Sequence, residues 1–431
     1  MDQKNRKELY MSTLTGKKLL VLGGTVSTYD VVRHAKKLGA YVIVTDYLTD
    51  GISKSIADES AMISTSDLDA LEKFAKEKKI DGVFTGPSEV NIKFAQQLCK
   101  RLNLPFYATE QQFEVSMNKK CFKKMCQLCE IPTATEYKIT SEENLNQIKD
   151  FPVIVKPVDG CSSKGISICN SLSELKKACP CARENSPTGE ILVEKYIEGY
   201  DDVCMYYTIQ NGNLTLSAMT DRDMNTLQQG KAPQPNALFF PSKHLNTYME
   251  VLHKKVEKFA EKLQLKNGTM FIQAFVKGQQ FIVFEMGYRL CGANEYVMVS
   301  KENGINTLDM YLTMALTGKF SGWDNKKCDN PYFKNRYCIL VPLLKQGKIF
   351  SCKCLNKIKA LKDVIYIQQF YHDGETVPES AMGTLNQTLA RIYICAKNEE
   401  ELKQAINKVK KLLVVKDSYG NNMILPGIKL N

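Results

Sequence analysis

The first part of the chain alternates between short apolar runs and segments in which apolar residues recur with helical periodicity. The runs have the length of buried strands and lie at 17–21, 41–45 and 82–85, and the helical segments lie at 29–38, 68–78 and 90–102. This alternation predicts a parallel sheet with helices on both faces. Such sheets bind ligands at the carboxyl ends of their strands, where the loops 23–25 and 85–89 are expected. The Gly-Gly pair of the first loop lacks the full dinucleotide spacing and predicts no nicotinamide or flavin site.

From about residue 118 the pattern changes to that of an α+β domain. A helix is followed by a β-rich stretch at 137–169, a helix at 172–179 and then paired strands. Beyond a polar loop near residue 325, strands at 338–343 and near 365 precede a helix at 399–412. The sequence therefore predicts a wound α/β domain, a central α+β domain and a small C-terminal α+β lobe, with bounds 1–117, 118–322 and 323–431.

The composition is that of an ordinary globular protein, with 431 residues, of which 44% are hydrophobic and 24% charged. We expect a cytoplasmic protein with no membrane contact, because the polar N-terminus lacks a signal-peptide pattern and no apolar run approaches the ~20 residues that span a bilayer. The formal charge of +11 is spread along the chain without an aromatic-interleaved basic patch, which favours a solvated surface over a nucleic-acid interface. The 15 cysteines are scattered, which indicates reduced thiols and not a disulfide framework or a zinc site.

Residues 151–165 place a lysine inside an apolar strand and follow it with a loop of small residues. A buried lysine is costly unless an anion pairs with it, so Lys156 is a candidate phosphate contact. The loop from Gly160 to Gly165, which includes Ser162 and Ser163, has the composition to lay backbone N–H groups against a polyphosphate. A surface turn explains the loop equally well from this segment alone.

Two later segments carry acidic and amide side chains whose oxygen atoms are candidate contacts for a nucleoside or a cation. An apolar strand at 191–195 runs into alternating acids and a glycine turn, where the acids face either a nucleoside or solvent. Strands are also predicted at 269–274 and 280–285. If residues 278–280 form a three-residue hairpin loop, Gln273 and Glu285 lie side by side. They then either ligate a hard cation together with nucleotide phosphates or form a cross-strand hydrogen bond.

The order of these features resembles the ATP-grasp superfamily over about residues 118–318. The motifs are a lysine before a helix, a lysine in a strand before a small-residue loop, Val-Glu-Lys-Tyr-Ile at 193–197, and then Gln followed by Phe-Glu-Met-Gly-Tyr-Arg at 284–289. The flanking regions are similar to the branch that contains biotin carboxylase, carbamoyl-phosphate synthetase and the purine-pathway ligases. In the C-terminal lobe the similar segments are 383–391 and 417–424.

The resemblance implies roles for residues that match the family's motifs, and a lid at about 135–197 that closes over ATP. It assigns Lys119 and Lys156 to the ATP phosphates, Glu194 and the backbone of Lys195 and Ile197 to the adenine edge, Asp201 to the ribose, Ile154 and Phe284 to the faces of the base, Gln273 and Glu285 to Mg²⁺ or Mn²⁺, and Arg289 to the acyl phosphate. The chain departs from the pattern at Gly287, where many members have an asparagine that ligates a further metal ion.

The implied activity is that of an ATP-dependent carboxylate–amine ligase, in which an acyl phosphate forms and ADP and phosphate are released. The substrates are expected to be small molecules, with the carboxylate supplied by an amino acid or another metabolite such as a sugar acid. We expect them between the loop 86–89, Arg289 and the segment 220–230, where Asp221, Arg222 and Asp223 supply charge or form surface ion pairs.

Other activities stay open at this point. Biotin carboxylation is disfavoured because Arg289 is not followed by the Glu-His of that motif, and carbamoyl-phosphate synthesis is disfavoured because one ATP-grasp unit is present. One alternative is an ATP-binding regulator that has lost catalysis, which the missing metal ligand at Gly287 would explain. Another is a carboxylase-type enzyme. Whether the chain forms a homodimer is also open.

Overall fold

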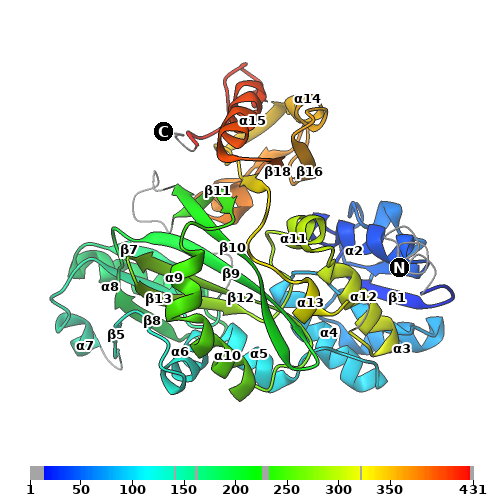
Figure 1. Cartoon of the computed structure of the whole chain (residues 1–431), viewed down its shortest axis with the longest axis horizontal. Coiled ribbons are helices and arrows are strands. Elements are labelled where there is room, and N and C mark those ends of the chain that lie inside the picture. Colours follow the sequence, from blue (N-terminus) through cyan, green and yellow to red (C-terminus); the bar gives the residue numbers. More distant parts are fainter. Residues whose placement is uncertain (1–13, 140–141, 161–163, 226–232, 321–322, 428–431) are drawn as a thin grey trace.

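The computed structural model describes residues 14–139, 142–160, 164–225, 233–320 and 323–427. A long antiparallel sheet runs through the middle of the molecule, with an N-terminal α/β domain on one side, a smaller sheet on the other and a C-terminal lobe above (Figure 1). This arrangement confirms the predicted mixture of α/β and α+β structure. No helix among the described residues is long and apolar enough to cross a membrane.

The N-terminal domain contains a parallel sheet in the order β3-β2-β1-β4. Each predicted strand and helix is present, although α2 begins at Val26 and not at residue 29. The elements are β1 (Lys18–Leu22), α2 (Val26–Lys37), β2 (Tyr41–Thr45), the 3-10 turn η1 (Lys54–Ile56), β3 (Glu59–Ala61), α3 (Leu68–Lys78), β4 (Gly82–Phe84), α4 (Glu89–Leu102) and α5 (Glu110–Met117).

The central sheet has the strand order β13-β12-β9-β10-β11-β14-β18-β16, so strands of the C-terminal lobe continue it. Strands β12 and β13 are longer than predicted. The central elements are α6 (Lys119–Leu128), β9 (Asp201–Gln210), β10 (Asn213–Asn225), β11 (Gln234–Phe240), α9 (Leu245–Val251), α10 (His253–Lys262), β12 (Gly268–Lys277), β13 (Gln280–Gly287), α11 (Tyr296–Asn303) and α12 (Thr307–Thr317).

A smaller sheet in the order β5-β8-β6-β7 lies at the far end from the N-terminal domain (Figure 1). Its helix α8 was predicted to end at residue 179, but it continues through Pro180 to Glu184. Burial of Leu175, Cys179 and Ala182 along one face outweighs the hydrogen bond lost at the proline. The elements are β5 (Glu136–Tyr137), α7 (Glu142–Asn146), β6 (Val153–Pro157), β7 (Ser167–Cys169), α8 (Leu172–Glu184) and β8 (Ile191–Lys195).

The C-terminal lobe combines the three strands that extend the central sheet with a small sheet in the order β17-β15-β19, in the part of the chain described. Its elements are α13 (Asn325–Cys328), β14 (Arg336–Leu340), β15 (Gly347–Ser351), α14 (Cys354–Lys359), β16 (Val364–Gln369), β17 (Thr376–Val377), the 3-10 turns η2 (Glu379–Ala381) and η3 (Leu385–Gln387), β18 (Ala390–Ala396), α15 (Glu399–Leu412) and β19 (Lys416–Asp417).

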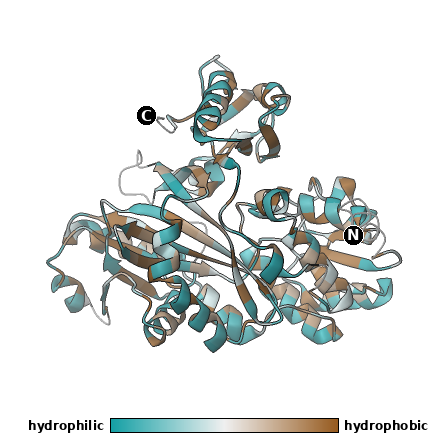
Figure 2. Ribbon diagram, viewed as in Figure 1, coloured by the Kyte–Doolittle hydropathy of each residue, from teal (hydrophilic) through white to brown (hydrophobic). Residues whose placement is uncertain are grey.

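The main hydrophobic cluster is continuous between the N-terminal domain and the central sheet, whereas the smaller sheet, the C-terminal lobe and part of the N-terminal domain have further clusters of their own. The main cluster extends from Val21 through Met205 to Tyr393. The smaller sheet buries its own cluster around Val153, Val155 and Leu175. Figure 2 shows hydrophobic residues along the strands and more polar residues on the outer helices. Because it has its own core, the smaller sheet is a structural unit that can move without opening the main core.

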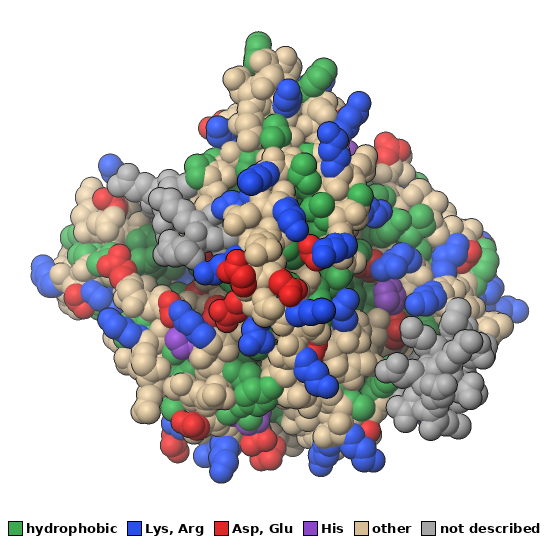
Figure 3. Space-filling model, turned by 45° about the horizontal axis from the view of Figure 1, so that its top comes forward, with side chains coloured by type: hydrophobic (Ala, Val, Ile, Leu, Met, Phe, Trp, Pro, Cys, Tyr) green, Lys and Arg blue, Asp and Glu red, His purple; other side chains and the backbone are tan. Residues whose placement is uncertain are grey.

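Basic side chains are distributed over the surface and not gathered in one stripe. On the face in Figure 3, lysines and arginines lie over all parts of the molecule, with acidic side chains among them.

A buried carboxylate ties three parts of the molecule together. Asp30 of α2 accepts hydrogen bonds from the hydroxyl groups of Tyr296 on α11 at 2.7 Å and Tyr366 on β16 at 2.6 Å. The guanidinium of Arg33 donates to the other carboxylate oxygen at 2.9 Å. Burial, followed by the charge of Asp30, raises the pKa of both phenols, so both act as donors. The junction holds the N-terminal domain and the C-terminal lobe in fixed positions on the central domain.

We expect Asp30→Ala to destabilise the protein by roughly 3 kcal/mol, because two buried phenols lose their acceptor. Asp30→Asn keeps an acceptor oxygen and should cost less. Asp69, whose side chain is 92% exposed beside Arg101, is the matched control, and Asp69→Ala should stay within about 0.5 kcal/mol of the parent protein. Urea denaturation measures all three, and an equal effect at positions 30 and 69 would refute the role of the junction.

Candidate active site

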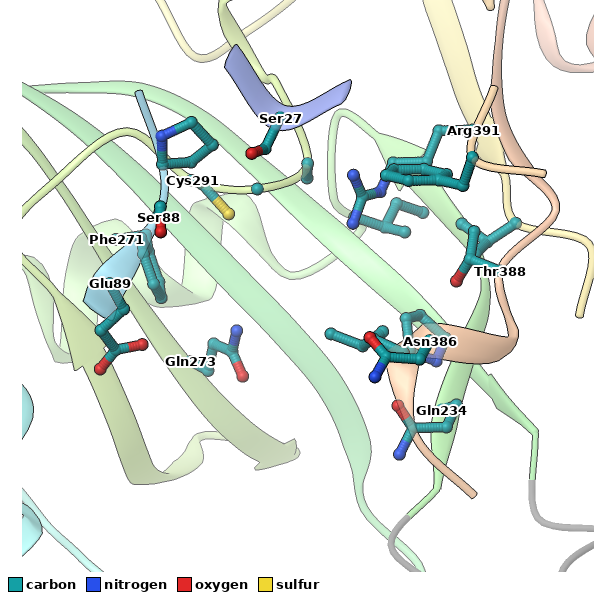
Figure 4. A pocket seen from close by; sticks show the side chains of 18 of the residues that line it. Ser27, Ser88, Glu89, Gln234, Phe271, Gln273, Cys291, Asn386, Thr388 and Arg391 are labelled. Atoms are coloured by element: carbon teal, nitrogen blue, oxygen red, sulfur yellow. The ribbon is translucent and has the colours of Figure 1, made fainter. Parts of the chain in front are cut away.

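A cavity of about 760 Å³ lies where the N-terminal domain, the smaller sheet, the central sheet and the C-terminal lobe meet. Ser27, in the first turn of α2 after β1, and the run 87–90, which joins the loop after β4 to the start of α4, line it, as expected at the carboxyl ends of a wound parallel sheet. In Figure 4 the side chains of Glu89, Phe271 and Gln273 lie on one side, and those of Arg391, Thr388 and Asn386 lie on the other. Predicted site residues that line the cavity are Lys119, Gly160, Gln273, Glu285 and Arg289.

Lys119 and the smaller sheet meet at one end of the cavity. The Lys119 Nζ donates to the carbonyl oxygen of Gly160 at 2.9 Å, and the Lys119 backbone N–H donates to Val158 at 3.0 Å. The start of α6 is therefore held against the turn that follows β6. Ser162 and Ser163 lie outside the described residues.

Lys156 is buried, and its anionic partner is a side chain of the protein. Glu194 on β8 forms ion pairs with both Lys156 of β6 and Lys123 of α6, and Lys123 also lies 3.4 Å from Glu136. Burial alone would raise the pKa of the Glu194 carboxyl, but the two lysines outweigh it and lower the pKa below its ordinary value. The sequence reasoning missed Lys123, although its position one helical turn after Lys119 predicts that both face the same way.

The residues predicted to surround adenine and ribose lie outside the residues that line the cavity. Ile154 and Phe284 are half-buried, and the ring of Phe284 stacks on Phe275 with centroids 4.5 Å apart. The Lys195 N–H donates to Thr135 at 2.9 Å, and its Nζ lies 2.6 Å from Asp150. Ile197 follows in a half-buried loop.

Asp201 begins β9 beside two basic side chains, with Lys243 at 2.9 Å and His244 at 2.8 Å. Burial raises the pKa of the Asp201 carboxyl, and the hydrogen bonds and charges of these two residues more than reverse that effect, so the pKa is lowered. The carboxylate is thus ionised and exposed, which suits a contact with hydroxyl groups.

The predicted pairing of Gln273 with Glu285 is present, but the predicted hairpin loop is wrong. Lys277 pairs with Gln280, so the loop has two residues and not three. A β-bulge between Gln273 and Ala274 then shifts the register, and Glu285 again lies opposite Gln273. A bulge adds one residue to one strand, which compensates for the shorter loop.

The surroundings of this pair fit a cation held mainly by Glu285. Among the described residues Glu285 has no hydrogen-bond or ion-pair partner and lines the cavity. The Gln273 Oε1 instead accepts a hydrogen bond from Arg222 Nη1 at 2.8 Å, so that oxygen already faces a positive charge. A carboxylate with one further oxygen and nucleotide phosphates is a usual site for Mg²⁺.

Arg289 lies next to the start of α4, which follows the loop after β4. Its Nη2 is 3.1 Å from Glu89 Oε2, and its guanidinium lies over the ring of Phe271, 5.1 Å from the centroid. Burial would lower the pKa of the guanidinium, but the acidic groups around it, Glu89 first and then Cys291 and Glu285, together outweigh burial and the pKa is raised. Arg289 is therefore a fixed positive charge in the cavity wall, next to the predicted substrate loop 86–89.

Of the charged triplet 221–223, only Arg222 lines the cavity. Asp221 accepts from Ser242 and from the Lys243 N–H, and Asp223 accepts from Asn236. These two acids make contacts within the protein, so Arg222 alone of the triplet stays a candidate for contact with a ligand. Residues 226–230 of the expected substrate segment lie outside the described residues.

A steric constraint explains why position 287 is a glycine. A Cβ atom at this position would lie 2.3 Å from the ring of Phe271, its partner across the strands. Phe271 thus occupies the space in which a side chain at position 287 would begin. The asparagine found here in many ATP-grasp proteins is incompatible with this ring position.

The wall formed by the C-terminal lobe has no predicted role. Arg391 lies over the ring of Phe370, 4.9 Å from its centroid, and donates to Gln368 Oε1 at 2.9 Å. Further lining residues are Tyr371, Glu375, Leu385, Asn386 and Thr388. The resemblance marks segment 383–391 as similar to the family's C-terminal lobe but gives these residues no role, because only the continuation of the central sheet brings them to the cavity.

Comparison with known proteins agrees with this geometry. Residues 149–295 match the model of the ATP-grasp domain. A formate-dependent phosphoribosylglycinamide formyltransferase of Prochlorococcus marinus is 24% identical over 315 residues, which are 71% of this chain and 77% of that protein.

Solved structures share the fold across nearly the whole chain. The L-amino acid ligase from Bacillus licheniformis has a TM-score of 0.74 at 18% identity and covers 94% of this chain and 100% of its own. Biotin carboxylase from Campylobacter jejuni has a TM-score of 0.73 at 18% identity, with 93% and 92% covered. The chain contains an ATP-grasp domain over residues 149–295, and the predicted resemblance to the ATP-grasp superfamily and its biotin carboxylase branch is confirmed. Its class is that of the ATP-dependent ligases.

Glu194→Gln should destabilise the protein by about 3 kcal/mol at pH 7, because the buried Lys156 loses its counter-charge and Lys123 keeps only Glu136 at 3.4 Å. Since the folded pKa of Glu194 is lowered, its contribution is present above the ordinary carboxyl pKa and is lost as pH falls through the folded value. The difference between parent and variant should therefore shrink on acidification, as measured by urea denaturation between pH 7 and pH 3.

Glu190 is the control for this measurement. It pairs with Lys120 of the same helix at 2.7 Å, but both side chains are about half exposed. We expect Glu190→Gln to change stability by less than about 0.5 kcal/mol with little dependence on pH. Equal effects of the two variants would contradict the buried cluster.

Gly287→Ala should cost about 1–3 kcal/mol, because the added methyl group overlaps the Phe271 ring. Phe271→Leu should relieve part of this cost in the double variant, which a double-mutant cycle of thermal unfolding detects. Gly292→Ala is the control, since its Cβ would meet nothing closer than Arg391 Nη2 at 3.9 Å. Additive effects of the substitutions at 287 and 271 would show that the two positions do not compete for space.

Proposed function

We propose that this ATP-grasp ligase joins a small carboxylic acid to an amine through an acyl phosphate. The observation that carries the proposal is the convergence, in one cavity, of Lys119, Gln273, Glu285 and Arg289. Lys119 would contact phosphate, Glu285 would hold a divalent cation with the Gln273 side chain beside it, and Arg289 would face the reacting acid. The supporting names among the related proteins are a formate-dependent formyltransferase and an L-amino acid ligase.

The first step would form the acyl phosphate. A carboxylate oxygen attacks the γ-phosphorus of ATP, the bond to the bridging oxygen of the β-phosphate breaks, and ADP leaves. The obstacle is repulsion between anions, which Lys119 and Arg289 reduce. A Mg²⁺ ion held by Glu285, with Gln273 as the other candidate ligand, would neutralise charge on the phosphate oxygens.

The second step would transfer the acyl group. The lone pair of the amine nitrogen attacks the acyl carbon, the carbon–oxygen bond to phosphate breaks, and phosphate leaves while the amine releases a proton. Arg289 is placed to stabilise the negative charge of the tetrahedral species because its guanidinium is fixed by Glu89 and Phe271. No side-chain nucleophile takes part.

Water must be kept from the acyl phosphate, and the smaller sheet β5-β8-β6-β7 is our candidate for the lid. Its separate hydrophobic core and the contact of Gly160 with Lys119 support this role. ATP would lie between this sheet and β12–β13, with the base near Ile154 and Phe284, the Glu194 side chain and the Lys195–Ile197 backbone at its edge, and the ribose near Asp201. Lys156 would turn from Glu194 to a phosphate when ATP binds.

The function is tested by release of ADP from ATP and Mg²⁺ in the presence of a pool of acids and amines. Release that requires both substrates supports the ligase. Release with bicarbonate and no other acid would indicate a carboxylase-type enzyme. Tight ATP binding without acid-dependent ADP release would indicate a regulator.

In this assay Arg289→Ala should lower turnover by about 10²–10³-fold, the usual effect of removing one donor from a developing negative charge. ATP affinity, measured by calorimetry, should change little because Arg289 lies on the substrate side of the cavity. Arg101→Ala, which removes a surface guanidinium paired with Asp69, controls for loss of charge. Normal ligation by Arg289→Ala would show that the catalytic assignment is wrong.

A further inference from the structure

Arg222 is a charged side chain built into the site where the metal ligands are expected. It is on β10, its side chain is 12% exposed, and its Nη1 group lies 3.0 Å from Asp202 Oδ1 and 2.8 Å from Gln273 Oε1. An arginine guanidinium is not deprotonated in proteins. The positive charge is therefore permanent.

This arrangement limits what Gln273 is able to bind. An arginine has donors only, so the amide oxygen of Gln273 must face Arg222 and its NH₂ group must face away. A divalent cation on the same oxygen would lie close to the guanidinium, and the two positive charges would repel each other. In this structure the side-chain oxygen of Gln273 is thus a hydrogen-bond acceptor for Arg222 and not a metal ligand.

A second observation removes another ligand from the same place. The ring of Phe271 excludes any side chain at position 287, so the further ligand that ATP-grasp proteins often have there is absent. Glu285 is then the carboxylate left to hold a cation at the β12–β13 pair. Among the described residues no group of three or more histidine, cysteine, aspartate and glutamate side chains lies close enough to hold a metal ion.

The guanidinium also has donors to spare. Its Nε and Nη2 groups donate to no atom of the described residues, and the side chain lines the cavity beside Gln273 and Glu285. A planar guanidinium with free N–H groups is well suited to bind phosphate oxygens. Arg222 thus combines a fixed charge with further hydrogen-bond donors in the wall of the cavity.

We propose that Arg222 is a built-in cation that binds the transferred phosphoryl group and replaces a second, side-chain-bound metal ion. The inference rests on the proposed function in that it takes the phosphates of ATP as the ligand. It predicts that the protein holds one divalent cation per bound nucleotide, by Glu285 and the phosphates.

The test is the number of Mn²⁺ ions bound by the full chain with the β,γ-imido analogue of ATP, measured by electron paramagnetic resonance. The parent protein should bind one Mn²⁺. The double variant Arg222→Met, Asp202→Asn removes both charges at similar volume, so no buried acid is left alone, and it frees the Gln273 oxygen. It should bind two.

Arg391→Met is the control, because it removes a guanidinium from the opposite wall of the cavity, where the partner is Gln368. Its Mn²⁺ count should equal that of the parent protein. Counts of one for the parent and two for the double variant support the proposal, and any other pair of counts overturns it. Where ligation is detected, the double variant should also turn over about 100-fold more slowly.

The proposed ligase activity and the proposed role of Arg222 can be refuted independently of each other. The Mn²⁺ count requires nucleotide binding but no ligation, so absence of acid-dependent ADP release would refute the ligase and leave the count to decide the role of Arg222.

Discussion

The register between β12 and β13 is the constraint on which the candidate site depends. With a two-residue loop and no bulge, Gln273 would lie opposite Phe284, and the side chain of Glu285 would belong to another pair. The bulge restores the pairing of Gln273 with Glu285 and, in the same register, places Phe271 opposite Gly287. A shift of one residue moves side chains to the other face of a strand, so this one irregularity selects the candidate ligands, the aromatic ring and the glycine together.

Charged groups in the site are held mainly by other charged groups of the chain. Glu194 lies between Lys123 and Lys156, Glu89 holds Arg289, and Asp202 holds Arg222. Buried charges require partners, and these pairs keep the cations in place before any nucleotide arrives. Binding of an anion then exchanges one partner for another and does not require a new charge to be buried, which suits a site for polyphosphate.

The site is also an assembly of parts that lie far apart in the sequence. The N-terminal domain supplies Glu89, the central sheet supplies Arg222, Gln273 and Glu285, and the C-terminal lobe supplies Arg391. The central sheet continues into the C-terminal lobe, and Asp30 ties that lobe to α2 and α11. The continued sheet and the Asp30 hydrogen bonds hold the C-terminal lobe and the N-terminal domain in place, and the smaller sheet has a separate core. Any opening motion is therefore concentrated at the proposed lid.

The amino-acid pattern alone predicted the main strands and helices of the N-terminal domain, though not β3 or α5, and the change to an α+β domain, because periodicity is a local property of the chain. Motif order named candidate residues from Lys119 to Arg289, of which Lys119, Gln273, Glu285 and Arg289 line the cavity. The amino-acid pattern failed where distant contacts decide. The helix predicted at 172–179 is extended to Glu184 by packing, and the hairpin loop was assigned one residue too long because a bulge leaves no mark in the local pattern. Strand pairing decides that Glu194 is the ion-pair partner of Lys156 and that Arg222 is the hydrogen-bond donor to Gln273. It also decides which residues surround Arg391 in the cavity wall. Only the tertiary structure decides this pairing, since burial and charge pairing act between residues that the sequence separates by many positions.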